Sequence, residues 1–185
     1  MERLALDPAL WLILHGAASL LFFSAAAHKL RDPVRFRVAL ADHRLLPRAA
    51  LPAVAFLFAS CELAVALGCL LPGVCPFAAM GGAALLCLYS GAVGINLARG
   101  RSELDCGCGG PAGGMRIGPG LLLRNLGLIV LLGFAALPMG GRALHPLDGV
   151  TVVSGVGVLA LLYTALETAL ANGSRTRRRL AWSRR

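Results

Sequence analysis

The sequence predicts an all-α protein, a polytopic membrane helical bundle, and three observations carry this prediction. Hydrophobic residues make up 57% of the 185 residues, charged residues only 15%, and the mean hydropathy is +0.74. The apolar residues gather in five runs, each of a length that can cross a bilayer as a helix. Most charged residues lie between these runs or near the ends of the chain. No soluble domain is therefore expected.

The first apolar run, residues 8–27, contains no charged residue and is predicted to be the first membrane span. Residues 24–27 resemble a signal-peptidase site. The segment before the run is a poor positive n-region, however, because it carries Glu2, Arg3 and Asp7. Cleavage would also export the basic segment that follows. We therefore predict an uncleaved span.

The segment 28–48 is strongly basic and is predicted to lie in the cytoplasm, where Lys and Arg accumulate. Its six cations are Lys29, Arg31, Arg35, Arg37, Arg44 and Arg48. Asp32 and Pro33 form a helix start, and apolar residues follow at helical spacing, namely Val34, Val38, Ala41 and Leu45. This pattern predicts a short amphipathic helix on the membrane surface, stopped by Pro47.

The next two runs, 49–71 and 76–98, are separated by an uncharged turn, so they are predicted to form a tight helical hairpin. A polar loop, 99–120, follows them. The fourth predicted span, 121–137, is the weakest of the five because Arg124 and Asn125 lie in its first turns.

The fifth predicted span, residues 150–171, leads into a basic C-terminal tail, 172–185. This tail is too polar to enter the membrane and is expected to be disordered or bound to the membrane surface. The sequence contains no internal repeat. The expected organisation is therefore one membrane bundle over residues 1–171, followed by the tail.

The distribution of cations predicts the topology. With five spans, fifteen of the eighteen Lys and Arg residues fall in the segment 28–48, the polar loop and the tail, which share one side. The other side holds only Arg3 and Arg142, and Arg124 lies within a span. Because cytoplasmic loops carry the excess of Lys and Arg, the N-terminus is predicted outside and the C-terminus inside. The polar loop is then cytoplasmic.

Two thiols in the polar loop are the strongest candidates for chemistry. Residues 103–110 read E-L-D-C-G-C-G-G, which places Cys106 and Cys108 one glycine apart. A disulfide across one residue needs a tight ring that glycine tolerates, and strained disulfides exchange readily. Arg99 and Arg101 upstream favour the reactive thiolate. We interpret the pair as redox-active; the alternatives are a turn that happens to hold two cysteines, or half of a metal site.

Glu62 is the second candidate because it lies near the middle of a predicted span. An ionised carboxylate at mid-membrane costs about 2.5–3.5 kcal/mol or more, so it should face the bundle interior and find a partner. Arg124 is the partner that we expect, with Asn96 and Asn125 supplying hydrogen bonds. Two roles stay open for this centre, a structural polar clamp and the handling of protons or a quinone.

The remaining Cys and His residues do not indicate a cofactor or metal site. Each of Cys61, Cys69, Cys75 and Cys87 is expected to pack as a small apolar residue, although Cys69 and Cys75 flank the external turn and could form a second redox pair. The four histidines are scattered among different elements. The formal net charge of +9 is explained by topology and lipid anchoring, so no nucleic acid is expected as a partner.

Six short motifs, in order, resemble the MauE group of DoxX-like redox-associated membrane proteins. They are H-K-L-R-D-P at 28–33, L-L-P at 45–47, C-E-L at 61–63, N-L-A-R-G-R at 96–101, D-C-G-C-G-G at 105–110 and R-N at 124–125. The resemblance covers the first four predicted spans. It implies a four-helix DoxX-like core, to which this chain adds a fifth, C-terminal span.

The resemblance also implies a place in the bacterial inner membrane and a part in maturing methylamine dehydrogenase. The partners that it implies are the small subunit of that periplasmic enzyme, which carries many disulfides, and a periplasmic thioredoxin-like protein, besides membrane lipids. Thiol chemistry would map onto Cys106 and Cys108, and supporting roles onto Glu62, Arg99 and Arg124. No cofactor is firmly implied, and a quinone is the one considered.

Three functions therefore stay open. The first is a membrane factor that uses the Cys-x-Cys pair for thiol-disulfide exchange, and the second is a non-catalytic assembly or export factor for the subunit. The third is a quinone-linked oxidoreductase of the DoxX type. The charge count places the Cys pair in the cytoplasm, whereas the implied target matures in the periplasm. Either the loop folds back into the bundle, or a second thiol pair relays electrons, or the protein supplies something other than a disulfide.

Overall fold

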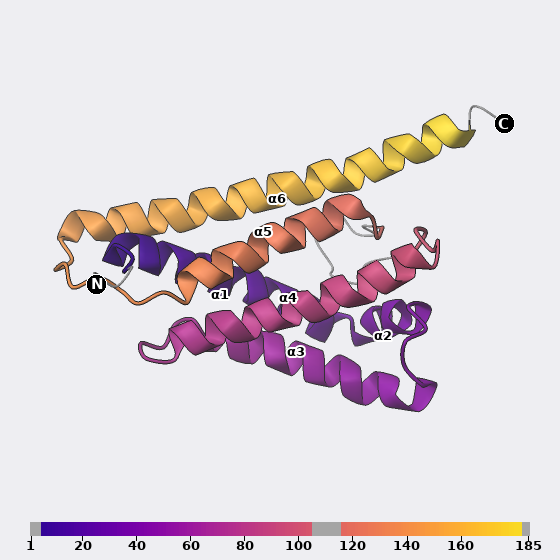
Figure 1. The fold of residues 1–185 in the computed structure, drawn as a ribbon, viewed down its shortest axis with the longest axis horizontal. Coiled ribbons are helices and arrows are strands. Elements are labelled where there is room, and N and C mark those ends of the chain that lie inside the picture. Colours follow the sequence, from indigo (N-terminus) through magenta and orange to yellow (C-terminus); the bar gives the residue numbers. More distant parts are fainter. Residues whose placement is uncertain (1–4, 105–115, 183–185) are drawn as a thin grey trace.

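The chain folds into a bundle of helices (Figure 1). The computed structural model describes residues 5–104 and 116–182, with only the course of the backbone for 174–182. Its elements are α1 (Pro8–Arg31), α2 (Pro33–Asp42), a 3₁₀ turn η1 (Arg48–Ala50), α3 (Leu51–Gly68), α4 (Cys75–Ala98), α5 (Pro119–Ala135) and α6 (Pro146–Trp182). The predicted all-α class is confirmed.

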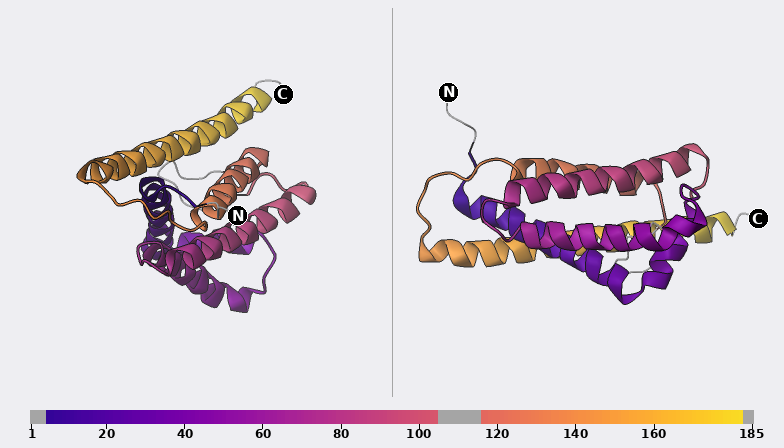
Figure 2. Two further views of the ribbon diagram at one scale, coloured as in Figure 1. Left: turned by 60° about the vertical axis from the view of Figure 1, so that its left-hand side comes forward. Right: turned by 90° about the horizontal axis from the view of Figure 1, so that it is seen from below.

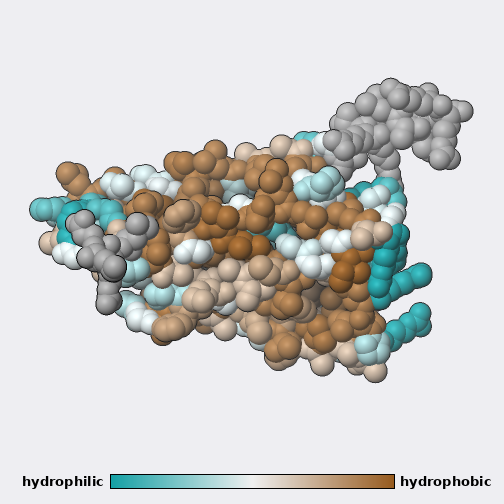
Figure 3. Space-filling model, in the orientation of Figure 1, coloured by the Kyte–Doolittle hydropathy of each residue, from teal (hydrophilic) through white to brown (hydrophobic). Residues whose placement is uncertain are grey.

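Five of the helices overlap the five predicted spans. Four helical segments are long and apolar enough to cross a membrane, namely α1, α3 together with η1, α4, and α6 as far as Gly173. Helix α5 is a shorter apolar helix. Large apolar side chains such as Phe77 (74% exposed) and Leu147 (77% exposed) lie on the outside. Figure 3 shows this apolar surface between hydrophilic ends. The protein is therefore a multi-pass membrane protein whose outer surface suits lipid.

Acidic caps and prolines set where the first two helices begin and end. The Asp7 carboxylate accepts a hydrogen bond from Ala9 N at 2.9 Å, and the Asp32 carboxylate accepts one from Arg35 N at 2.9 Å. Pro33 disfavours helical backbone at Asp32, so α1 ends at Arg31. This end lies one turn beyond the predicted end at residue 27. The added turn brings Lys29 into the bundle.

Helix α2 confirms the predicted short helix but turns a different face to the bundle. Phe36 and Ala39 are buried, whereas Val34 and Val38 of the predicted apolar stripe are 59% and 56% exposed. Two apolar faces compete on this helix, and the one that carries the aromatic ring fills the space beside α3. The valine face is left on the outside of the bundle.

Small residues allow the helices to approach closely. In the α3–α4 hairpin the turn contains Gly73 with φ +85°, a conformation that side chains disfavour. A Cβ atom at Gly82 of α4 would lie 2.7 Å from the ring of Phe22 in α1. The Ser19 hydroxyl donates to Ala66 O at 2.8 Å and joins α1 to α3. The bundle is thus held by close contact and polar links, as is usual in lipid.

Helix α6 lies along one side of the bundle and packs mainly on α1 (Figures 1 and 2). A Cβ atom at Gly155 of α6 would lie 2.7 Å from Ile13, so glycine lets these helices meet. The helix was expected to end near residue 171, but it continues to Trp182. Arginine, leucine and alanine, which dominate this end, are strong helix formers, so the backbone propagates the preceding helix.

The N-terminal ends of α1 and α6 are tied to the loop between α5 and α6. The Arg142 guanidinium contacts the carboxylates of Asp7 at 2.8 Å and Asp148 at 3.0 Å. Trp11 donates its indole N–H to Leu137 O at 3.2 Å. The hydrogen bonds from Arg142 also hold the pKa of the Asp7 carboxyl below its usual value. This end of the bundle lies opposite the polar loop between α4 and α5.

Candidate functional site

Glu62 is buried in the bundle and is partnered by two side chains from other helices. The Lys29 Nζ atom of α1 donates to both carboxylate oxygens, at 2.7 and 2.8 Å. The Tyr89 hydroxyl of α4 donates to the same carboxylate at 2.8 Å. The side chains of Lys29 and Glu62 are only 3% and 1% exposed. This cluster, Lys29, Glu62 and Tyr89, is called the first polar cluster below.

The geometry of the first polar cluster neutralises a charge that the membrane would otherwise disfavour. A carboxylate in hydrocarbon is tolerated when its charge is paired and its oxygens are hydrogen-bonded. The Lys29 ammonium also lies over two aromatic rings, 5.1 Å from the centre of Phe36 and 5.3 Å from that of Tyr89. The cluster joins α1, α3 and α4.

A second polar cluster also combines a cation, a glutamate and a tyrosine. The Arg124 guanidinium of α5 donates to the Glu167 carboxylate of α6 at 2.7 Å, and the Tyr163 hydroxyl donates to that carboxylate at 2.7 Å. Arg124 also donates to Asn125 Oδ1 at 2.9 Å, and Asn125 donates to the Ser90 hydroxyl of α4 at 3.1 Å. The second polar cluster therefore joins α4, α5 and α6.

Both tyrosines of the chain thus serve the same purpose, each donating to a buried glutamate that is paired with a cation. Tyr89 of the first cluster and Ser90, which accepts from Asn125 of the second, are consecutive residues of α4. The expected pairing of Glu62 with Arg124 is wrong. Helix α5 packs mainly against α4, so Arg124 meets α6, and the additional turn of α1 supplies the partner of Glu62.

A third polar group holds the end of α2 against the end of α4. Asn96 donates through Nδ2 to His43 Nδ1 at 3.0 Å and to Ala92 O at 3.0 Å, while its Oδ1 accepts from Arg101 at 2.9 Å. Arg101 also donates to the carbonyl of Asp42 at 2.8 Å. Burial and the nearby Arg101 charge lower the pKa of His43 below its usual value, so the imidazole is neutral at pH 7.

The polar loop that follows Arg101 is closed at its base. Ile117 N donates to Leu104 O at 3.0 Å, and Arg116 forms an ion pair with Glu103. Cys106 and Cys108, the predicted redox pair, lie outside the described residues. Their segment begins and ends at this closed base, beside the Arg101 contacts with the end of α2.

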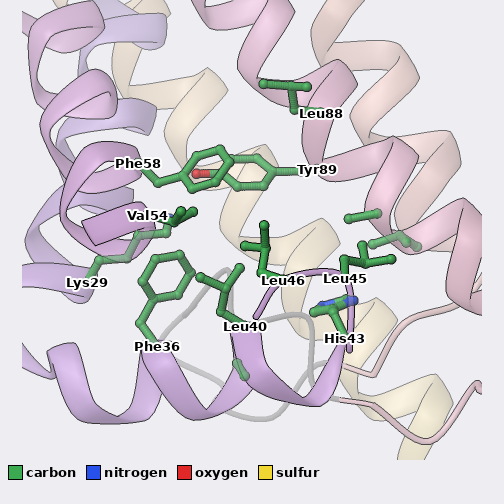
Figure 4. A pocket seen from close by; sticks show the side chains of 13 residues that line it. Lys29, Phe36, Leu40, His43, Leu45, Leu46, Val54, Phe58, Leu88 and Tyr89 are labelled. Carbon is green, nitrogen blue, oxygen red and sulfur yellow. The ribbon is translucent and has the colours of Figure 1, made fainter. Parts of the chain in front are cut away.

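A pocket of about 230 Å³ opens between α2 and the α3–α4 hairpin (Figure 4). Its walls are mostly apolar, and they include the aromatic rings of Phe36, Phe58 and Tyr89. Lys29 lines one end and His43 another part of the wall. The ring centres of Phe58 and Tyr89 lie 5.1 Å apart. We call this feature the α2 pocket; it lies beside both the first polar cluster and the Asn96 group.

The remaining predicted residues occupy separate places. Arg99 is the C-cap of α4, directly after Ala98, and it is exposed. Cys69 and Cys75, at the other end of the hairpin, are both 2% exposed and not bonded to each other. Burial, with a smaller contribution from Cys75, raises the pKa of the Cys69 thiol to about 11. Within residues 5–104 and 116–182, no group of three or more His, Cys, Asp or Glu could hold a metal ion.

Several residues of these clusters were missed from the sequence, and some gave a usable signal. Glu167 lies inside an apolar run, as Glu62 does, so the same argument would have selected it. Lys29 lies two residues past the first apolar run, within reach of an interior carboxylate. Tyr89 and Tyr163 gave no signal of this kind, because a tyrosine in a membrane span also packs as an ordinary aromatic residue.

Comparison with known proteins places this architecture. The family model of "Methylamine utilisation protein MauE" matches residues 7–138, which extend from the cap of α1 past the end of α5. Three similar proteins carry the name methylamine utilization protein MauE. That of Methylophilus methylotrophus is 32% identical over 90% of this chain and 89% of its own length. That of Paracoccus versutus is 35% identical over 88% of both chains.

The third relative, from Methylorubrum extorquens, is 31% identical over 92% of this chain and 93% of its own. These matches extend over nearly the whole chain, so they take in α6 as well as the region that the family model covers. No solved structure matches the chain.

Proposed function

Because the chain belongs to the methylamine utilisation protein MauE family, we propose that it is a membrane factor in the maturation of periplasmic methylamine dehydrogenase. The step assigned to it is disulfide formation in the small subunit of that enzyme. The reacting groups are Cys106 and Cys108. The family ties the chain to methylamine utilisation, and the Cys-x-Cys sequence is the single observation that carries the proposed chemistry.

The exchange proceeds from the oxidised pair. A thiolate of the subunit attacks the Cys106–Cys108 disulfide, forming a mixed disulfide and releasing the other cysteine as a thiolate. A second subunit thiolate then displaces the bound cysteine, leaving a disulfide in the subunit and a reduced pair. Two electrons have moved from the subunit to the pair. An oxidised thioredoxin-like periplasmic protein is the proposed acceptor that restores the Cys106–Cys108 disulfide.

The scaffold around the loop supports this assignment. The hydrogen bond between Leu104 and Ile117 and the ion pair between Glu103 and Arg116 hold the two ends of the Cys segment together. Arg101 ties its start to the end of α2. This closed base fixes where the Cys segment leaves and rejoins the bundle. The two buried ion pairs keep the spans beneath it in one arrangement.

We place the protein in the bacterial inner membrane with its N-terminus outside and its arginine-rich C-terminus inside. The fifteen-to-two distribution of cations supports this orientation. It puts the two ends of the Cys loop on the cytoplasmic side, so exchange with the periplasmic subunit requires that the loop folds back into the bundle, where a periplasmic partner can reach it. Cys69 and Cys75 lie at the other end of the hairpin, but the raised pKa of Cys69 disfavours its attack on a disulfide. Reporter fusions at the C-terminus and within the Cys loop test the orientation.

A non-catalytic assembly or export factor is the alternative, and the cytoplasmic placement of the loop favours it. The two functions respond differently to serine substitution. If the pair exchanges disulfides, Cys106→Ser and Cys108→Ser each abolish formation of active dehydrogenase, and one of them accumulates a mixed disulfide. An assembly factor tolerates both, because serine keeps the size of each side chain. Normal dehydrogenase in the double variant, at normal membrane levels, contradicts the proposed exchange.

A further inference from the structure

The α2 pocket is not used by the proposed thiol chemistry, and its walls describe the occupant that it suits. Its volume of about 230 Å³ exceeds the roughly 150 Å³ at which apolar cavities stay dry and bind benzene. Leu88, which lines the pocket, is 60% exposed, so the pocket reaches the apolar surface of the bundle. An apolar molecule dissolved in the membrane can therefore enter it.

His43 offers a hydrogen-bond donor to this occupant, and the surrounding contacts fix which ring nitrogen carries the proton. The three contacts of Asn96 orient its amide, since Oδ1 accepts from Arg101 and Nδ2 donates to both Ala92 O and His43 Nδ1. His43 Nδ1 must therefore accept, and the neutral ring carries its proton on Nε2. No described residue accepts a hydrogen bond from this N–H. His43 lines the α2 pocket and can donate to a molecule within it (Figure 4).

The charge balance of the pocket selects a neutral molecule. Lys29 is the one cationic side chain along the lining, and the Glu62 carboxylate already neutralises it through two hydrogen bonds. An anion would have to compete with that buried pair. The rings of Phe36, Phe58 and Tyr89 instead offer apolar and aromatic surface.

We propose that the α2 pocket binds the carbonyl-bearing part of a neutral membrane amphiphile, whose carbonyl oxygen accepts a hydrogen bond from His43 Nε2. The apolar remainder lies along the aromatic wall and leaves the pocket past Leu88. Two membrane molecules share this chemistry, the acyl ester of a phospholipid and the ring of a quinone. This site goes beyond the proposed disulfide exchange and does not depend on it.

Two amide variants of His43 separate the role of Nε2 from that of Nδ1. In His43→Asn the side-chain oxygen can replace the acceptor Nδ1 beside Asn96, but no donor reaches the position of Nε2. In His43→Gln the amide N–H₂ can reach that position. A second pair tests the volume: Ala39→Phe fills the pocket from α2, whereas Val38→Phe adds the same ring on the exposed face of the same helix.

The measurement is photolabelling of the full-length protein in bilayers, followed by mapping of the labelled peptides. One probe is a phosphatidylcholine with a diazirine on its acyl chain near the ester, and the other is an azido-quinone with a short alkyl tail. We expect one probe to label residues 36–46 and 88–93. An excess of the same molecule without the photoreactive group should reduce this labelling. The probe that labels identifies the source of the carbonyl.

Labelling should fall about fivefold in His43→Asn, the factor that one hydrogen bond of ordinary strength contributes, and stay near the wild-type level in His43→Gln. Ala39→Phe should abolish it, and Val38→Phe should leave it unchanged. The proposal is overturned if neither probe labels these segments above the level on exposed α6, or if His43→Asn labels as strongly as the wild type. Unfolding curves of each variant verify that the bundle is intact, and the His43 pair decides the question if Ala39→Phe does not fold.

Discussion

Replacing Lys29 by methionine is expected to destabilise the bundle strongly, because it leaves the Glu62 carboxylate without its cation. The lost contacts are the hydrogen bonds of 2.7 and 2.8 Å, between side chains that are 3% and 1% exposed. Removal of one partner of a buried pair costs about 3–5 kcal/mol. An acidic residue at mid-membrane costs about 2.5–3.5 kcal/mol. We therefore expect a loss of about 3 kcal/mol in the free energy of unfolding, where the ranges overlap.

The assay is unfolding in mixed dodecyl sulfate and dodecyl maltoside micelles, followed by circular dichroism. The double variant Lys29→Met with Glu62→Gln removes both charges and leaves an amide to accept from Tyr89. It should recover to within about 1 kcal/mol of the wild type. Arg31→Met, at the exposed end of the same helix, is the control and should change the free energy by about 0.5 kcal/mol or less. The reasoning is refuted if Lys29→Met matches this control, or if the double variant is as unstable as the single one.

Three further predictions concern other parts of the bundle. Arg124→Met should lower the free energy of unfolding by about 3 kcal/mol in the same assay, and adding Glu167→Gln should restore most of it, as for the other buried pair. If the double variant is not restored, the ion pair does not contribute to stability. Folding lowers the pKa of His43. Its contribution to the free energy of unfolding is therefore complete above the unfolded pKa of about 6.5 and is lost as the pH falls toward the folded pKa. Unfolding at pH 5 and 7.5 should show this loss in the wild type but not in His43→Asn. Burial raises the pKa of Cys69, so this thiol should react with iodoacetamide about tenfold faster for each pH unit between 7 and 9 and far more slowly at pH 7 in the folded protein than in the unfolded protein. Equal rates in the two states would contradict its burial.

The sequence predicted the helices well because helix length, hydropathy and proline positions are local properties. The start of α2 was found from Asp32 and Pro33, and the hairpin from its uncharged turn. The same Asp-Pro pair also ends α1, and this second consequence extends α1 to Arg31. The extension of α1 past Lys29 was therefore predictable from Asp32 and Pro33, although the predicted span ended one turn earlier.

The partners in the polar clusters were harder to predict, because they depend on which helices are neighbours. Glu62 was identified as an interior carboxylate from its position alone. The sequence offers Arg124 as a partner for either Glu62 or Glu167. Only the position of α5 between α4 and α6 shows that Arg124 pairs with Glu167, which leaves Glu62 to Lys29. Tyr89 could be placed on Glu62 only from the spatial arrangement of α3 and α4, since hydropathy carries no information about which face of each helix meets the other.

The most direct test of the proposed function is the redox state of Cys106 and Cys108 in cells that are forming methylamine dehydrogenase. The other four cysteines are replaced by alanine, the cells are quenched in acid, and free thiols are tagged with a maleimide that adds mass. Disulfide exchange predicts that a fraction of the protein is tagged only after reduction, and that this fraction falls when the thioredoxin-like partner is deleted. A pair that stays fully reduced in both strains, while active dehydrogenase accumulates, contradicts the account. The same tagging with an impermeant reagent on spheroplasts shows which side of the membrane the pair faces.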